Sequence, residues 1–166
     1  RFGHWLEIEL LAVEAWAELG RIPPQDAAEC RERASFTVGA VLEREAVTRH
    51  DVAAFVDVVA ASIGDAGRWI HFGMTSSDVV DTAFALQLRA ASDILLADLE
   101  RLLAVVRRQA LAHRDTACIG RSHGVHAEPT SFGHKLAVFA FQLDRDRDRR
   151  LEYYDRLRTL IVESGW

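Results

Sequence analysis

A run of apolar residues between Asp78 and Ala112 constrains the fold most, because it recurs at steps of three and four residues. Its members are Phe84, Leu88, Ala91, Leu95, Leu99, Leu102 and Val106. This spacing places their side chains on one stripe of a long α-helix, as in helical bundles. One helix cannot bury such a stripe alone. The pattern therefore predicts partner helices from the same chain or from other subunits.

Helical periodicity continues on both sides of this run, and strand patterns are nearly absent. The predicted helices span residues 2–19, 24–34, 38–46, 51–63, 78–112 and 129–162. Residues 116–126 are predicted to be irregular or briefly extended. We therefore predict an all-α fold, in which a small N-terminal helical domain (1–77) leads into the first part of a long-helix bundle (78–166). We expect the chain to be a piece of a longer protein, with this bundle incomplete.

Composition argues against several classes of function. The formal net charge is −5, so no basic field is present to bind nucleic acid. No apolar run approaches the length of about 20 residues that a membrane helix needs, and the first residues do not resemble a signal peptide. Cys30 and Cys118 lie far apart and outside any metal-ligand spacing. We expect two reduced thiols, no metal site and a cytoplasmic location.

Three short segments carry an unusual density of polar side chains. The first comprises Thr48, Arg49, His50 and Asp51, next to a predicted helix N-terminus. A guanidinium and an imidazole at such a position suit a phosphate or a carboxylate. A simple capping cluster, with Thr48 or Asp51 as the cap, explains the segment equally well.

The second segment runs from His71 to Asp78 and delivers three consecutive hydroxyls to the start of the long helix. The hydroxyls belong to Thr75, Ser76 and Ser77. Together with the free backbone N–H groups of a helix start, they suit a carboxylate. An ordinary helix cap, with Ser77 or Asp78 in that role, is the structural alternative, and clusters of this kind open many helices.

The third segment, 120–130, places two histidines, two glycines and a proline at the entry to the last predicted helix. His123 is the candidate acid–base residue, because imidazole can donate or accept a proton near neutral pH. A metal site is not supported, since two histidines and one glutamate lack a clear third and fourth ligand. The structural alternative is a tight loop with one hydrogen-bonded histidine.

Together the three segments resemble the fumarase/aspartase superfamily, and within it most closely the adenylosuccinate lyase family. The similar runs are TRHDV, HFGMTSSDVVDTA and GRSHGVHAEPTSFG, in the family's order and at similar spacing. The opening helix, WLEIELLAVEAWAELGRIP, also resembles the family's start. The resemblance implies a cofactor-free lyase that eliminates fumarate from adenylosuccinate and from the succinyl-carboxamide ribotide. It also implies a homotetramer whose active sites are shared between subunits.

The resemblance further implies roles for individual residues. His123 would be the general acid. The nucleotide part of the substrate would contact Arg49, His50 and Asp51. The succinyl end would be held by Thr75 and Ser76, with Ser77 beside them. His71 would line the pocket, and Ser122 would bind substrate at a position where many family members have threonine.

One departure from the family pattern limits what this chain can do alone. The family's catalytic base is a serine on a Gly/Ser-rich loop with a Met-Pro-x-Lys-x-Asn signature, and the sequence contains no such run. We therefore expect the base to lie outside this chain and the isolated chain to be inactive. Two alternatives remain at this point, namely another fumarate-releasing lyase or a non-catalytic helical assembly fragment.

Overall fold

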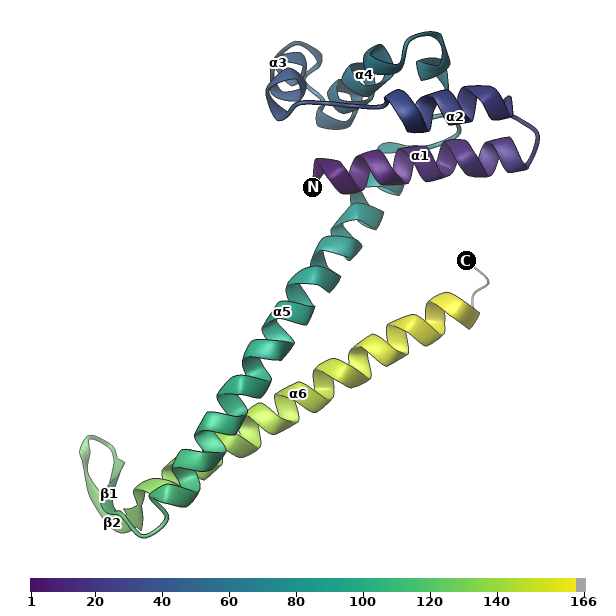
Figure 1. Cartoon of the computed structure of the whole chain (residues 1–166). Coiled ribbons are helices and arrows are strands. Elements are labelled where there is room, and N and C mark those ends of the chain that lie inside the picture. The colour runs from purple at the N-terminus through teal and green to yellow at the C-terminus, as the bar shows by residue number, and fades with distance from the viewer. Residues whose placement is uncertain (164–166) are drawn as a thin grey trace. The chain divides into compact units, whose positions relative to one another are not determined.

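The computed structural model describes residues 1–163 and is built mainly of helices, which confirms the predicted fold class (Figure 1). The elements are α1 (Phe2–Glu18), α2 (Pro24–Arg33), α3 (Val38–Thr48), α4 (Asp51–Ile63), the 3₁₀-helix η1 (Asp65–Trp69), α5 (Ser76–Ala112), β1 (Ala117–Ser122), β2 (Val125–Ser131) and α6 (Phe132–Glu163). Two compact units, residues 1–90 and 91–166, meet within α5. The domain boundary placed after residue 77 stays a prediction.

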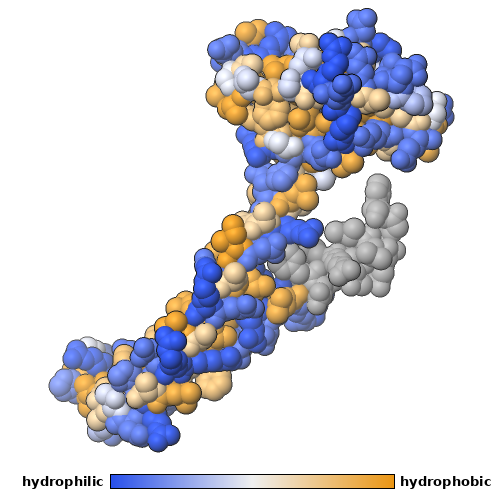
Figure 2. Space-filling view, viewed as in Figure 1, coloured by the Kyte–Doolittle hydropathy of each residue, from blue (hydrophilic) through white to orange (hydrophobic). Residues whose placement is uncertain are grey.

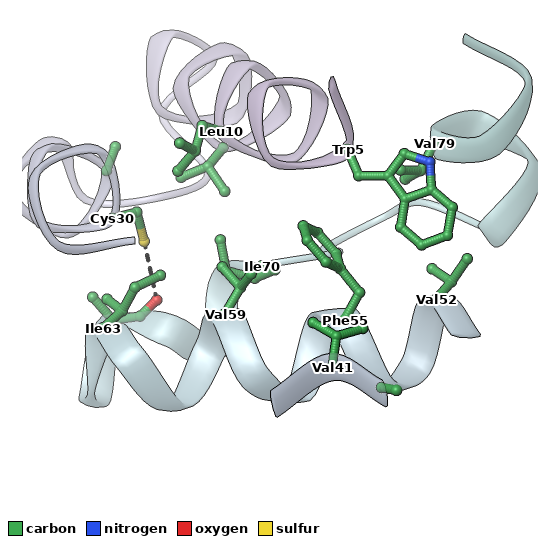
Figure 3. Packing of buried hydrophobic residues seen from close by; sticks show 14 of the residues in the cluster. Trp5, Leu10, Cys30, Val41, Val52, Phe55, Val59, Ile63, Ile70 and Val79 are labelled. Atoms are coloured by element: carbon green, nitrogen blue, oxygen red, sulfur yellow. Dashed lines mark hydrogen bonds between the residues drawn. The ribbon is translucent and has the colours of Figure 1, made fainter. Parts of the chain in front are cut away.

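The core of the first unit is a cluster of aromatic and β-branched side chains between α1 and α4 (Figure 3). Trp5 and Phe55 are buried and meet edge to face, with ring centroids 5.4 Å apart. Phe2 stacks on Phe55, with ring centroids 5.7 Å apart. Aromatic pairs in this geometry add to the stabilisation that comes from burial alone. This packing fixes α1 against α4, and both helices carry residues of the candidate site.

Close backbone contacts hold the turn between α4 and η1. A Cβ atom on Gly67 would lie 2.2 Å from the carbonyl oxygen of Ala60, so only glycine fits there. The buried thiol of Cys30, on α2, donates to the carbonyl of Ala66 at 3.3 Å (Figure 3). Burial raises the pKa of this thiol, and the nearby carboxylates of Asp26 and Glu29 raise it further. Cys30 is therefore a structural thiol in this unit.

The second unit contains the C-terminal half of α5, a two-stranded antiparallel hairpin and α6. The backbone N–H of Gly133 donates to the carbonyl of His113 at 2.9 Å, which joins the start of α6 to the end of α5. Further along, the guanidinium of Arg107 on α5 contacts the carboxylate of Asp144 on α6 at 2.8 Å. These contacts join α5 to α6, and the hairpin connects the two helices.

The predicted start of the last helix, at Pro129, is wrong. Pro129 lies in β2 and pairs with Ile119 of β1, and α6 begins three residues later at Phe132. The side-chain oxygen of Ser131 accepts a hydrogen bond from the backbone N–H of His134 at 3.1 Å, as an N-cap residue does. Proline suits both the first turn of a helix and the edge of a sheet, so Pro129 alone does not predict which of these structures forms.

The apolar stripe of α5 is only partly covered within this chain. Phe84, Leu88, Leu95 and Leu102 all remain at least half exposed. Figure 2 shows hydrophobic side chains at intervals along the visible face of this helix. The exposure agrees with the prediction that the stripe needs further partners. None of the helices described is long and apolar enough to cross a membrane.

Candidate functional site

Each of the three polar segments contains one residue with a strained backbone conformation. Within residues 1–163, the non-glycine residues with positive φ are Arg49 (54°), His71 (67°) and His123 (53°), and each lies in a different segment. Such conformations cost of the order of 1–3 kcal/mol each and concentrate at functional sites. The backbone geometry therefore indicates the same three segments as the sequence motifs do, and it does so independently of those motifs.

The first segment forms the sharp turn between α3 and α4. His50, rather than Thr48 or Asp51, is the N-cap residue of α4, because its Nδ1 accepts a hydrogen bond from the backbone N–H of Ala53 at 3.3 Å. The capping residue expected from the sequence is therefore wrong. An accepting Nδ1 carries no proton, so the proton of the neutral ring is on Nε2. His50 thus presents an N–H donor away from the helix.

The charged residues of this turn differ in their availability. Asp51 forms an ion pair with Arg1, whose guanidinium lies 4.4 Å from the centre of the Trp5 ring. The guanidinium of Arg49 is exposed and has no ion-pair or hydrogen-bond partner among the described residues. A bidentate donor held on a tight turn can bind a phosphate or carboxylate. The guanidinium of Arg49 is therefore available to an anionic ligand, whereas the carboxylate of Asp51 is already neutralised by Arg1.

His71, in the second segment, is held by a buried carboxylate on α1. Glu9 is fully buried, and its Oε1 lies 2.7 Å from Nδ1 of His71. Its other oxygen, Oε2, accepts a hydrogen bond from the backbone N–H of His71, also at 2.7 Å. One carboxylate therefore holds both the ring and the strained backbone of the same residue. Nε2 of His71 has no hydrogen-bond partner within the described part of the chain.

Sequence reasoning missed Glu9, although a signal was present. Trp5, Glu9 and Val13 follow one another at four-residue steps and occupy the most buried face of α1. A carboxylate in the middle of an apolar face must find donors inside the protein. Leu6 and Leu10, which flank Glu9 on the helix, indicate an apolar face, and that pattern alone does not predict a buried charge.

The start of α5 leaves three hydroxyls available. The helix begins at Ser76, two residues before the predicted start, and Thr75 precedes it. The carboxylate of Asp78 accepts a hydrogen bond from the backbone N–H of Thr75 at 2.8 Å. Asp78 therefore lies inside the first turn, as the acidic residue of a capping box does, and is not the N-cap residue. The hydroxyls of Thr75, Ser76 and Ser77 form no hydrogen bond with any described residue. They and the helix dipole remain free to bind a carboxylate.

His123 lies at the tip of the hairpin formed by β1 and β2. Ser122 pairs with Val125, which leaves His123 and Gly124 as the two turn residues, both with positive φ (53° and 77°). Two such residues make a type I′ turn, in which asparagine or glycine usually takes the first place. His123 occupies that place at a cost in strain. Its exposed ring, like the hydroxyl of Ser122, has no hydrogen-bond partner among residues 1–163.

The structure distributes the predicted site residues over both units. The first unit contains Arg49, His50, Asp51, His71, Thr75, Ser76 and Ser77. The second contains Ser122 and His123. Within the described residues, no group of three or more His, Cys, Asp and Glu side chains is arranged to hold a metal ion.

Comparison with known proteins shows the class to which this helical chain belongs. The family model described as lyase matches residues 2–166, and the chain therefore belongs to this family, within the fumarase/aspartase superfamily. Solved structures agree with this. A fumarate lyase from Mesorhizobium superimposes with a TM-score of 0.83 and 30% identity, over 91% of this chain and 36% of that one. A 3-carboxy-cis,cis-muconate lactonizing enzyme from Pseudomonas putida gives 0.83 and 34%, over 95% and 37%.

Within this family the chain is similar to curated adenylosuccinate lyases. It is 52% identical to that of Bacillus subtilis over 149 residues, which is 90% of this chain and 35% of that protein. It is also 52% identical to that of Synechocystis over 145 residues, which is 87% of this chain and 34% of that protein. The chain thus spans about a third of the length of these relatives. The resemblance inferred from the three segments is confirmed.

Proposed function

We propose that the complete protein, meaning this chain with whatever its gene encodes on either side, is an adenylosuccinate lyase. It would release fumarate from adenylosuccinate, giving AMP, and from the succinyl-carboxamide ribotide of purine biosynthesis. The observation that carries the proposal is the 52% identity with a curated adenylosuccinate lyase over 90% of the chain. The geometry of the three segments supports it, because each presents groups that suit a different part of such a substrate.

The chemistry is a β-elimination. A base removes a proton from the carbon next to a carboxylate, the electron pair forms the carbon–carbon double bond of fumarate, and the bond from carbon to nitrogen breaks. An acid must then protonate the leaving nitrogen. His123 fits that role, because its ring stands exposed at a hairpin tip without a partner among the described residues. Ser122, beside it, supplies a hydroxyl to the substrate.

The remaining segments would hold the substrate. Carboxylates of the succinyl part fit the start of α5, where Thr75, Ser76 and Ser77 offer hydroxyls at the positive end of the helix dipole. The nucleotide part fits the turn between α3 and α4, where Arg49 offers a guanidinium without an ion-pair partner among residues 1–163, and His50 offers an N–H donor. Asp51, already paired with Arg1, would shape this end of the site.

The rest of the enzyme would come from outside this chain. We propose that the catalytic base is a serine on a loop in the remaining two thirds of the protein, since the relatives are about three times longer. The half-exposed stripe of α5 supports assembly with further helices, as in a cytoplasmic homotetramer with shared active sites. The isolated chain would then be inactive.

A substrate screen with the complete protein tests this proposal. Fumarate release is followed with adenylosuccinate, argininosuccinate and aspartate under the same conditions. Preference for adenylosuccinate is the expected result. Preference for argininosuccinate or aspartate would contradict the proposal and favour the second candidate, a different fumarate-releasing lyase. Absence of fumarate release from all three would favour a non-catalytic helical module.

A further inference from the structure

Glu9 is the one charged side chain that is fully buried among the described residues. Burying a carboxylate is costly unless both oxygens receive hydrogen bonds. Here both donors come from a single residue, the ring and the backbone of His71, which lies 62 positions away in the sequence. A carboxylate needed only to join α1 to this loop could use any nearby donors. The double contact instead specifies the orientation of one imidazole.

The contact also fixes the proton on that imidazole. Both oxygens of an ionised carboxylate are acceptors, so Nδ1 of His71 must donate to Oε1 of Glu9. In the neutral ring the other nitrogen, Nε2, then carries a lone pair and accepts hydrogen bonds. The same carboxylate stabilises the left-handed backbone of His71 through its N–H. Hydrogen bonds to charged groups are among the stronger ones in proteins, so this contact offsets the strain of that conformation.

We propose that Glu9 is a positioning residue of the active site, which holds His71 as the Nδ1–H tautomer so that Nε2 accepts a hydrogen bond from a hydroxyl or N–H group of the substrate. The inference rests on the proposed function for the identity of that substrate. Glu9 itself, being fully buried, does not touch the ligand. Its effect is carried entirely by His71.

The Glu9→Gln variant separates positioning from packing, because glutamine has nearly the same shape but only one acceptor. The backbone N–H of His71 cannot change, so the amide oxygen must turn towards it. The amide NH₂ then faces Nδ1, and the ring has to move its proton to Nε2 to accept from it. The variant thus converts Nε2 from an acceptor into a donor while leaving the fold in place.

Solid-state NMR of the complete protein with ring-¹⁵N-labelled histidine reads the tautomer directly, at a pH high enough to keep the ring neutral. The His71 signals are identified by their loss in the His71→Asn variant. We expect Nδ1–H in the wild type and Nε2–H in Glu9→Gln. We also expect kcat/KM for adenylosuccinate to fall about tenfold or more in Glu9→Gln. The matched control is Glu7→Gln, which removes an exposed carboxylate from the same helix and should change neither reading.

The His71→Asn variant keeps the test decisive if Glu9→Gln fails to fold. Asparagine tolerates positive φ, and its NH₂ can replace Nδ1–H as the donor to Glu9. It has no group in place of Nε2, so we expect a folded protein with little turnover. The inference is overturned if either variant cleaves adenylosuccinate normally, or if Glu9→Gln retains the Nδ1–H tautomer. If the wild type releases no fumarate, the proposed function fails, and the tautomer comparison still decides the positioning of His71.

Discussion

Gly133, at the start of α6, lies against the last turn of α5 so closely that a Cβ atom there would be 2.4 Å from the carbonyl oxygen of Ala110. The backbone N–H of the same glycine donates to the carbonyl of His113. The two helices therefore meet through backbone atoms at this point. Because the hairpin that carries His123 connects these two helix ends, this contact sets where the hairpin begins and ends.

Gly133→Ala should consequently destabilise the protein. The added methyl group must displace backbone, and overpacking of this kind costs typically 1–3 kcal/mol. Thermal unfolding of the complete protein, with the wild type beside it, measures the effect as a lowered Tm. Gly39→Ala is the matched control, because a Cβ on Gly39 of α3 meets nothing within 4 Å. That helical change should raise stability by about 0.5–1 kcal/mol. Equal effects of the two changes would contradict the close contact.

Cys30 should react slowly with alkylating reagents in the folded protein. Its thiol is buried, and a raised pKa keeps it in the protonated, unreactive form. Iodoacetamide labelling followed by peptide mass spectrometry measures the rate. We expect modification of the Cys30 peptide only when denaturant is present. Rapid modification under native conditions would show that α2 does not seal this thiol against η1 as described.

Glu14 should contribute stability that depends on pH. Its hydrogen bond with Arg31, at 2.6 Å, lowers the pKa of the carboxyl below its ordinary value of 4.5. A lowered pKa in the folded state means that the contribution is present above pH 4.5 and is lost as the pH falls below it. Both side chains are more than one third exposed, so solvent screening limits the contribution to roughly 0.2–1 kcal/mol.

The Glu14→Gln variant measures this contribution. Its Tm should be slightly below that of the wild type at pH 7, and the two should converge as the pH is lowered through the acid range. Glu43→Gln serves as the control, since Glu43 is exposed and has no ion-pair partner among the described residues. A deficit that stays constant with pH would show that Glu14 acts through packing rather than through its charge.

Most helices could be predicted because their signals are local. The boundaries of α2 and α4 follow from Pro24 and from the apolar face that begins at Val52. Of the hairpin, only the extended backbone of β1 could be predicted, within residues 116–126, because the two strands carry few apolar residues facing a core. Its turn, His123-Gly124, is a type I′ turn with an unusual first residue. With histidine in place of the usual asparagine or glycine, the turn lacks the local signal that would have revealed the hairpin.

The part of the candidate site that could be predicted also has local signals in the sequence. Arg49, His71 and His123 stand out in the sequence because polar groups cluster around them, and their strained backbones agree with that reading. Glu9 did not stand out, because its importance comes from a contact with a residue far along the chain. Tertiary contacts of this kind leave a weak trace in one sequence. The capping role of His50 was missed because imidazole is not among the usual capping groups.

Turnover of adenylosuccinate by the His123→Asn variant of the complete protein tests the central claim most directly. Asparagine accepts the left-handed backbone at the hairpin tip but cannot act as an acid near neutral pH. We expect kcat to fall by about 10²–10⁴-fold, the usual contribution of a general acid. His126→Asn, three residues along the same hairpin, should remain close to the wild type. Near-normal turnover by His123→Asn would contradict the role given to this residue.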